Sequence, residues 1–154
     1  MKVILPGSYD PITLGHLDVI RRAAEIYSEI YVVAFVNPAK EYMFTPDERV
    51  KMLSLATEGI KGVKTDFSDG RVVDYMKEHG IDKILKGYRN EKDLAYEKTQ
   101  AEYNLIHGGF KTELIEASPD FENISSTIAR ELIKSGDSLN GILPENVISF
   151  IKKR

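Results

Sequence analysis

The sequence predicts a single α/β domain over residues 1–154, with a doubly wound, Rossmann-like parallel sheet of five strands and helices on both faces. Short apolar runs alternate with segments of helical periodicity, which is typical of β-α-β units with right-handed crossovers. Residues 30–36 are apolar without interruption, as expected of a strand covered on both faces. A length of 154 residues suits one domain, and no linker or internal repeat divides it.

The expected strands are the apolar runs between turn residues. The first run ends at Pro6-Gly7, and the third is the least apolar because Lys64, Thr65 and Asp66 interrupt it. The expected strands cover residues 3–5, 30–36, 63–67, 81–85 and 112–116.

Caps and glycines indicate where the helices begin and end. Thr45-Pro46-Asp47-Glu48 combines a capping threonine, a proline at the first helical position and a glutamate three residues after the cap. Gly80 and Gly136 are well placed to end helices. The expected helices cover residues 15–27, 45–58, 72–79, 91–106, 126–134 and 144–152.

Composition narrows the classes of function. The absence of cysteine excludes disulfides, cysteine-ligated zinc and thiol nucleophiles. A net charge of −3 argues against a nucleic-acid-binding protein, so an anionic ligand must meet local positive charge from Lys40, Lys86, Arg89 or the helix N-termini. No run approaches the length of a membrane span and nothing resembles a signal peptide, so we expect a cytoplasmic location without membrane partners.

The most informative segment is residues 6–16, Pro-Gly-Ser-Tyr-Asp-Pro-Ile-Thr-Leu-Gly-His, between the first strand and the first helix. In parallel sheets ligands bind beyond the carboxyl ends of the strands, and a helix N-terminus can hold phosphate. The alternative is a plain βα turn with His16 at the surface, and Gly15-His16 alone does not decide between the two.

A second segment, residues 124–130 (Ile-Ser-Ser-Thr-Ile-Ala-Arg), places three consecutive hydroxyls at a helix start. They could serve as a cap only, or bind phosphate oxygens with the help of the helix dipole. Together, in this order, the two segments resemble the (H/T)xGH and ISSTxxR motifs of the nucleotidyltransferase superfamily that includes class I aminoacyl-tRNA synthetases.

Within that superfamily the chain resembles the bacterial phosphopantetheine adenylyltransferase family along essentially its whole length. The resemblance implies transfer of AMP from ATP to 4′-phosphopantetheine, giving dephospho-CoA and pyrophosphate. It also implies Mg²⁺ dependence, a homohexamer and CoA as a feedback inhibitor. No carboxylate cluster marks a metal site built by the protein, so Mg²⁺ is expected to arrive with the ATP phosphates. Further matching segments are residues 37–40, 43–45, 70–75, 86–89, 93–97 and 143–147.

The resemblance also assigns roles to individual residues. His16, Lys40 and Arg89 would be catalytic. The acceptor substrate would contact Ser8, Lys40, Val72 and Lys86. The residues expected to bind ATP are Ser8, Tyr9 (through its backbone), His16, Gly87, Tyr88, Arg89, Glu97, Phe121, Glu122, Asn123, Ile124, Ser125, Ser126 and Thr127.

Three positions depart from the family pattern: Ser8 stands where the family usually has Thr, Lys86 where it usually has Arg, and Tyr88 where it usually has Leu. Without the resemblance, Lys40 would be read as a surface charge and Glu97 as a helix residue paired with neighbouring lysines in solvent.

The expected chemistry needs no general base. A phosphate monoester has its second pKa near 6, so it is mostly a dianion at pH 7 and already nucleophilic. Positioning can lower the barrier by roughly 7–11 kcal/mol, and donors aimed at the α-phosphate add stabilisation of the transition state. His16, at a helix N-terminus, is therefore expected to act as a neutral hydrogen-bond donor.

Other classes of function remain as alternatives. Nicotinamide mononucleotide adenylyltransferases share ISSTxxR, but are usually longer and carry HxGH where this chain has Thr13. A glycerol-phosphate cytidylyltransferase differs in the second motif. A flavodoxin-like or nucleotide-sensing module would explain the fold and the loops, but it does not need Lys40, Lys86 and Arg89 around one cleft.

Overall fold

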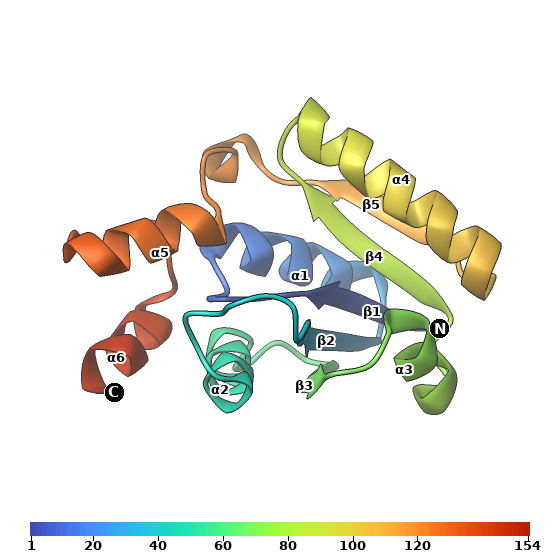
Figure 1. Cartoon of the computed structure of the whole chain (residues 1–154), viewed down its shortest axis with the longest axis horizontal. Helices are drawn as coiled ribbons and strands as arrows, with labels where there is room; N and C mark the ends of the chain where they lie inside the picture. The colour runs from blue at the N-terminus through green and yellow to red at the C-terminus, as the bar shows by residue number, and fades with distance from the viewer.

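The computed structural model describes residues 1–154 and contains one sheet of five parallel strands in the order β3-β2-β1-β4-β5. The chain starts in the middle of the sheet, runs outward to β3 and then returns to the other side of β1 (Figure 1). This is the predicted doubly wound topology. The strands are β1 (Lys2–Gly7), β2 (Glu29–Phe35), β3 (Val63–Ser68), β4 (Lys83–Tyr88) and β5 (Thr112–Glu116).

Helices cover both faces of the sheet, as predicted. The larger core cluster joins one face to α1, α2, α5 and α6, and a smaller cluster joins the other face to α3. In β1 the split is visible between neighbours, because Val3 and Leu5 belong to the larger cluster and Ile4 to the smaller. The helices are α1 (Leu14–Ile26), α2 (Pro46–Ala56), α3 (Val72–His79), α4 (Glu91–Gly108), α5 (Ser126–Ser135) and α6 (Glu145–Lys153).

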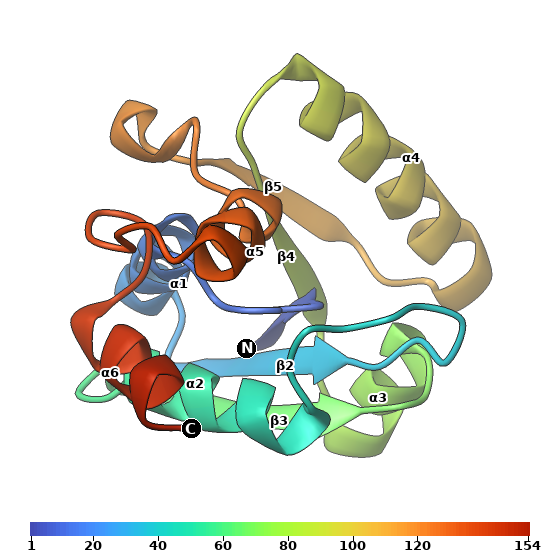
Figure 2. The ribbon, with the colours of Figure 1, turned by 60° about the vertical axis from the view of Figure 1, so that its left-hand side comes forward.

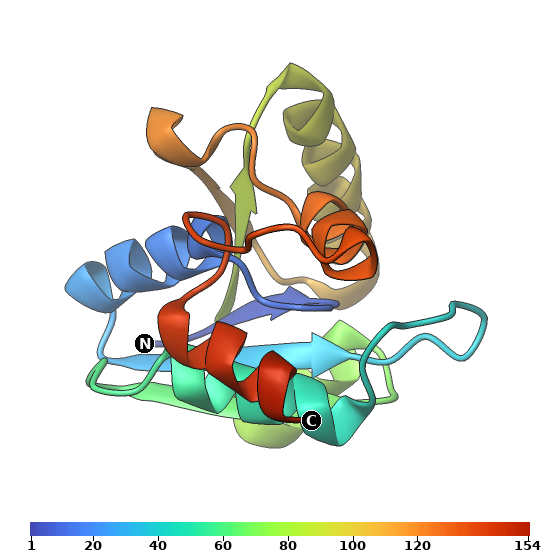
Figure 3. The ribbon, with the colours of Figure 1, turned by 90° about the vertical axis from the view of Figure 1, so that its left-hand side faces the viewer.

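Local signals account for most helix ends. Thr45 and Glu48 form the predicted capping box of α2, with bonds of 2.9 and 3.1 Å. Gly80 and Gly136 adopt left-handed backbone conformations that end α3 and α5. The C-terminal α6 packs beside α2 (Figure 3), where Asn146 donates a hydrogen bond to the carbonyl of Leu55 at 2.6 Å.

The predicted strand at residues 81–85 is displaced in the structure, where β4 covers Lys83–Tyr88. Ile81 is buried in the turn before the strand, so its apolar side chain does not mark a strand residue. The strand continues to Tyr88 because Lys86, Gly87 and Tyr88 pair with β5. A short 3₁₀ turn, η1 (Pro119–Phe121), was not expected from the sequence.

The central strand β1 and its neighbour β4 separate at their carboxyl ends. β1 pairs with β2 along its whole length, but only Val3 and Ile4 pair with β4. Beyond Ile4 the end of β4 diverges from β1, as Figure 1 shows. Such a separation leaves room for a ligand between β1 and β4. This is the point of the sheet where the direction of winding reverses, because the chain adds β2 and β3 on one side of β1 and β4 and β5 on the other. No helix of the structure is both long enough and apolar enough to cross a lipid bilayer.

Candidate active site

Two connected cavities lie at the carboxyl end of the sheet. The first cavity, of about 250 Å³, lies between the ends of β1 and β4 and the start of α1. The second cavity, of about 760 Å³, extends from the same strand ends toward α3, α4 and the segment after β2. Four residues line both cavities and therefore form their junction: Pro6, Gly7, Ser8 and Lys86.

His16 lies in the wall of the first cavity and forms a capping box with Thr13 at the start of α1. The backbone N–H of Thr13 donates to Nδ1 of His16 at 3.0 Å, so the other ring nitrogen, Nε2, carries the proton in the neutral imidazole. The pKa of His16 is lowered to about 4, mainly by burial and in addition by the positive charges of Lys86 and Arg89. The ring is thus a neutral donor at physiological pH, although the main cause is burial and not the helix N-terminus.

Tyr9 lies in the turn after β1 and lines the first cavity. Its φ of 47° is in the left-handed region, which few non-glycine residues adopt. The side chain is buried, donates to the carbonyl of Leu5 at 2.9 Å, and touches the ring of His16 edge-on at 5.1 Å. Burial raises the pKa of the Tyr9 hydroxyl, so the group stays neutral. That Tyr9 contacts a nucleotide through its backbone stays a prediction.

The end of β4 brings positive charge to the cavities. Lys86 Nζ lies 3.3 Å from Glu97 Oε2 and 3.3 Å from the carbonyl of Pro6. Arg89 lies in the wall of the first cavity, with its Nε 3.2 Å from Asp93 Oδ2. Both cations keep part of their surface exposed, so they remain available to an anion in the junction.

The residues expected on the acceptor side gather around one cavity. Ser8, Lys40, Val72 and Lys86 all line the second cavity, although they come from four separate segments of the chain. Lys40 lies in an exposed turn between β2 and α2. Val72 begins α3. The carboxyl ends of neighbouring parallel strands meet at one edge of the sheet, which accounts for this convergence.

The residues expected to bind ATP are less uniformly placed. Ser8, Tyr9, His16, Gly87 and Arg89 line the first cavity. From the segment 121–127, only Ile124 and Ser126 line it. Tyr88 lines neither cavity.

Glu97 lines the second cavity and not the first. It is the one buried residue of α4, and its partner is Lys86. The alternative that Glu97 pairs in solvent with lysines of its own helix is therefore wrong.

The three hydroxyls at the start of α5 already have partners within the protein. Ser125 caps the helix by accepting from the N–H of Ile128 at 3.2 Å. Ser126 donates to the carbonyl of Pro11 at 2.8 Å, and Thr127 accepts from Arg130 at 3.2 Å. Ser125 is therefore a helix cap, while Ser126 also lines the first cavity; phosphate binding by this segment stays a prediction.

The structure also brings Thr13 and Asp93 into the site, although neither was among the predicted site residues. Thr13 and Asp93 line the first cavity, where Thr13 orients His16 and Asp93 pairs with Arg89. The sequence indicates the pairing of Asp93 with Arg89, because Asp93 lies four residues after Arg89 and three after Asn90, the residue that caps α4. No group of three histidine, cysteine or carboxylate side chains is arranged to hold a metal ion.

Similarity to known proteins agrees with this geometry. The family model described as cytidylyltransferase-like matches residues 4–132, a range that includes both motif segments. The fold and the site therefore define a nucleotidyltransferase of the cytidylyltransferase-like class. A protein of Corynebacterium efficiens named phosphopantetheine adenylyltransferase is 37% identical to this chain, over 100% of this chain and 98% of its own. A protein of the same name from Corynebacterium diphtheriae is 40% identical, over 99% and 97%. The chain belongs to the phosphopantetheine adenylyltransferase family.

Proposed function

We propose that this chain transfers AMP from ATP to 4′-phosphopantetheine and releases dephospho-CoA and pyrophosphate. The observation that carries the proposal is the pair of cavities that meet at Ser8 and Lys86. The first is lined by half of the residues expected to hold ATP, among them His16, Gly87 and Arg89, and the second by all four residues expected to hold the acceptor. Their junction is where a phosphate of each substrate would meet.

In this reaction an oxygen of the acceptor phosphate forms a bond to the α-phosphorus of ATP. The bond from that phosphorus to the oxygen bridging to the β-phosphate breaks, and the electron pair leaves with pyrophosphate. The dianionic acceptor needs no proton removed. The protein's task is to hold two anions in line and to stabilise the negative charge on the α-phosphate.

The residues of the site divide this task. Lys40 and Lys86 would hold the acceptor phosphate, with Ser8 at the contact between both substrates. His16 would donate its Nε2 proton in a hydrogen bond to the α-phosphate, and Arg89 would hold phosphates of ATP. Each donor gains strength as charge builds up, because the cavity is partly shielded from water.

Magnesium fits this site only as an ion that ATP brings. Asp93 is the one carboxylate of the first cavity, and it is paired with Arg89 at 3.2 Å. The phosphate oxygens of ATP would therefore be the main ligands. When bound, the ion would neutralise charge on the leaving pyrophosphate.

A pyrophosphate-release assay tests the proposal. We expect release with ATP and 4′-phosphopantetheine, and none with pantetheine, which lacks the nucleophilic phosphate. Release with nicotinamide mononucleotide instead would identify the other adenylyltransferase class. Nucleotide binding without release would favour a sensing module and contradict the proposal.

We further propose that the chain assembles into a homohexamer and that CoA inhibits it. α4 stands along the edge of the molecule over β4 and β5 (Figure 2), and exposes Tyr96, Tyr103 and Ile106. Exposed apolar side chains on one helix are typical of contact surfaces. Light scattering would test for six copies. CoA shares the pantetheine arm of the acceptor, so its inhibition should be competitive with 4′-phosphopantetheine. A cytoplasmic location without nucleic-acid or membrane partners stays a prediction of the sequence.

A further inference from the structure

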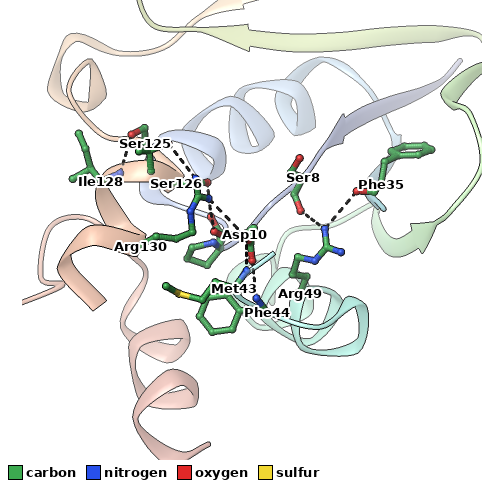
Figure 4. Close-up of polar contacts among 12 residues, drawn as sticks. Ser8, Asp10, Phe35, Met43, Phe44, Arg49, Ser125, Ser126, Ile128 and Arg130 are labelled. Carbon is green, nitrogen blue, oxygen red and sulfur yellow. Dashed lines mark hydrogen bonds and ion pairs between the residues drawn. The ribbon is translucent and has the colours of Figure 1, made fainter. Parts of the chain in front are cut away.

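Two buried charged residues lie behind the cavities without lining either of them. Asp10 is 3% exposed and Arg49 is 0% exposed. The carboxylate of Asp10 accepts from the backbone N–H groups of Met43 and Phe44, both at 2.9 Å. Nη1 of Arg49 donates to the carbonyls of Ser8 at 2.9 Å and of Phe35 at 3.4 Å. Figure 4 shows both sets of contacts side by side.

These contacts hold both ends of the segment that carries Lys40. Phe35 is the last residue of β2, and Met43 and Phe44 come just before the cap of α2. Between them, residues 37–41 are exposed. At the other end of these contacts lie the carbonyl of Ser8 and the carboxylate of Asp10. These two residues flank Tyr9 in a single turn. The Lys40 segment is therefore attached at two points to the turn that forms the junction of the cavities.

The charge of Arg49 has no counterpart in the protein. None of the ion pairs includes it, and its Nε and Nη2 are buried without a hydrogen-bond partner. Its guanidinium stacks on the ring of Tyr42 at 4.1 Å. A buried, uncompensated cation is costly for folding. Three residues that it touches, Ser8, Phe35 and Tyr42, line the second cavity, so an anion bound there would lie near its charge.

We propose that Asp10 and Arg49 are positioning residues that hold the Lys40 segment against the Ser8 turn, and that Arg49 adds a fixed positive charge behind the acceptor phosphate. This inference rests on the proposed function. Neither residue touches a substrate. A short exposed segment attached at both ends keeps fewer conformations, so Lys40 is held near its working position before the acceptor binds.

Kinetics would measure the effect of the two contacts. In Asp10→Asn and Arg49→Gln, we expect kcat/KM for 4′-phosphopantetheine to fall about 10- to 100-fold, as for a misplaced catalytic group. The KM for ATP should change less than about twofold, and Arg49→Lys should recover part of the loss because it restores the charge. In a Lys40→Ala background Asp10→Asn should cost little more, whereas Arg49→Gln should still lose the part that comes from its own charge. Equal losses for both substrates, or full additivity of Asp10→Asn with Lys40→Ala, would overturn the proposal.

A second readout is independent of activity. Since the chain has no cysteine, Ala39→Cys provides a single site for a spin label beside Lys40. We expect the label to become more mobile in Asp10→Asn and Arg49→Gln, while a label at Glu78→Cys on α3 does not change. An unchanged label at residue 39 would overturn the positioning role even in a protein without the proposed activity. If Arg49→Gln does not fold, Asp10→Asn and Arg49→Lys decide the matter.

Discussion

The backbone N–H of Thr13 donates a hydrogen bond to Nδ1 of His16 at 3.0 Å, so the residue that caps α1 also selects the protonated nitrogen of the imidazole. The proton on Nε2 remains available to a ligand in the first cavity. Because the pKa of His16 is lowered to about 4, the ring does not gain a second proton at neutral pH. A residue in this state suits donation to a phosphate and is a poor proton source.

We expect His16→Ala to lower kcat about 10²- to 10³-fold, which is the cost of removing one donor to a transition-state oxyanion. The KM for ATP should change less than about threefold, because the contact strengthens mainly as the charge moves. Steady-state kinetics with His107→Ala as control, an exposed histidine at the end of α4, would measure this. Equal losses in kcat and in ATP affinity would contradict the transition-state role.

The pKa of His16 also predicts a dependence of stability on pH. Between pH 6.5 and about 4 the unfolded chain binds a proton at this histidine and the folded chain does not. The free energy of unfolding should therefore decrease as the pH falls through this window, by up to about 3 kcal/mol from this group. Urea denaturation of the wild type and of His16→Asn at both pH values checks the sign. The same decrease in both proteins would rule out His16 as its source.

We expect Gly15→Ala to weaken the binding of ATP without lowering the stability of the fold. A Cβ at Gly15 would lie 3.5 Å from Thr13 Oγ1 and 3.7 Å from Phe121 Cβ, which are ordinary contact distances. The melting temperature should therefore stay the same or rise, since alanine favours a helix. If the glycine leaves room for the nucleotide, the KM for ATP should rise about tenfold or more. As a contrast, Gly62→Ala should destabilise the fold, because its Cβ would lie 2.2 Å from the carbonyl oxygen of Ser28.

We expect Lys40→Ala to lower kcat about 100-fold and to raise the KM for 4′-phosphopantetheine, since a charged donor to the acceptor is lost. Because residue 40 is exposed, the melting temperature should not change. Lys134→Ala, another exposed lysine at the end of α5, is the matched control. A near-normal rate would remove Lys40 from the site.

We expect Lys86→Ala to raise the KM for 4′-phosphopantetheine about 10- to 100-fold, as for a lost hydrogen bond to a charged group. It should also destabilise the fold, because Glu97 would keep a nearly buried carboxylate without its partner at 3.3 Å. Adding Glu97→Gln should recover stability but not acceptor affinity. Lys86→Arg should bind the acceptor at least as well as wild type, because guanidinium can hold phosphate through two hydrogen bonds.

Much of the fold was predictable because its signals are local. The apolar run of β2, the capping box of Thr45 and Glu48, and the glycines that end α3 and α5 all lie where the sequence indicates. The bounds of β4 were not predictable. Its last residues, Lys86 to Tyr88, are polar or small, and only pairing with β5 keeps them in the strand.

In the candidate site, too, local features were predictable and contacts between distant segments were not. The motif that contains His16 was recognisable because a strand end, a turn and a helix start are contiguous in the chain. The pairing of Glu97 with Lys86 was not, since a residue on α4 is buried only through the way that helix lies on β4. The contacts of Asp10 and Arg49 were not predictable either, because they join residues 14 to 41 positions apart in the sequence.

The sequence by itself determined the order of strands and helices, the caps, and the two motif segments at the helix starts that hold His16 and Ser126. These follow from contacts between residues a few positions apart. Only the tertiary structure decided that β1 and β4 part after Ile4, that Lys86 faces Glu97, and that the Lys40 segment is attached to the turn around Tyr9. The physical reason is that burial and charge pairing depend on distances between segments, which exist only once the sheet has formed.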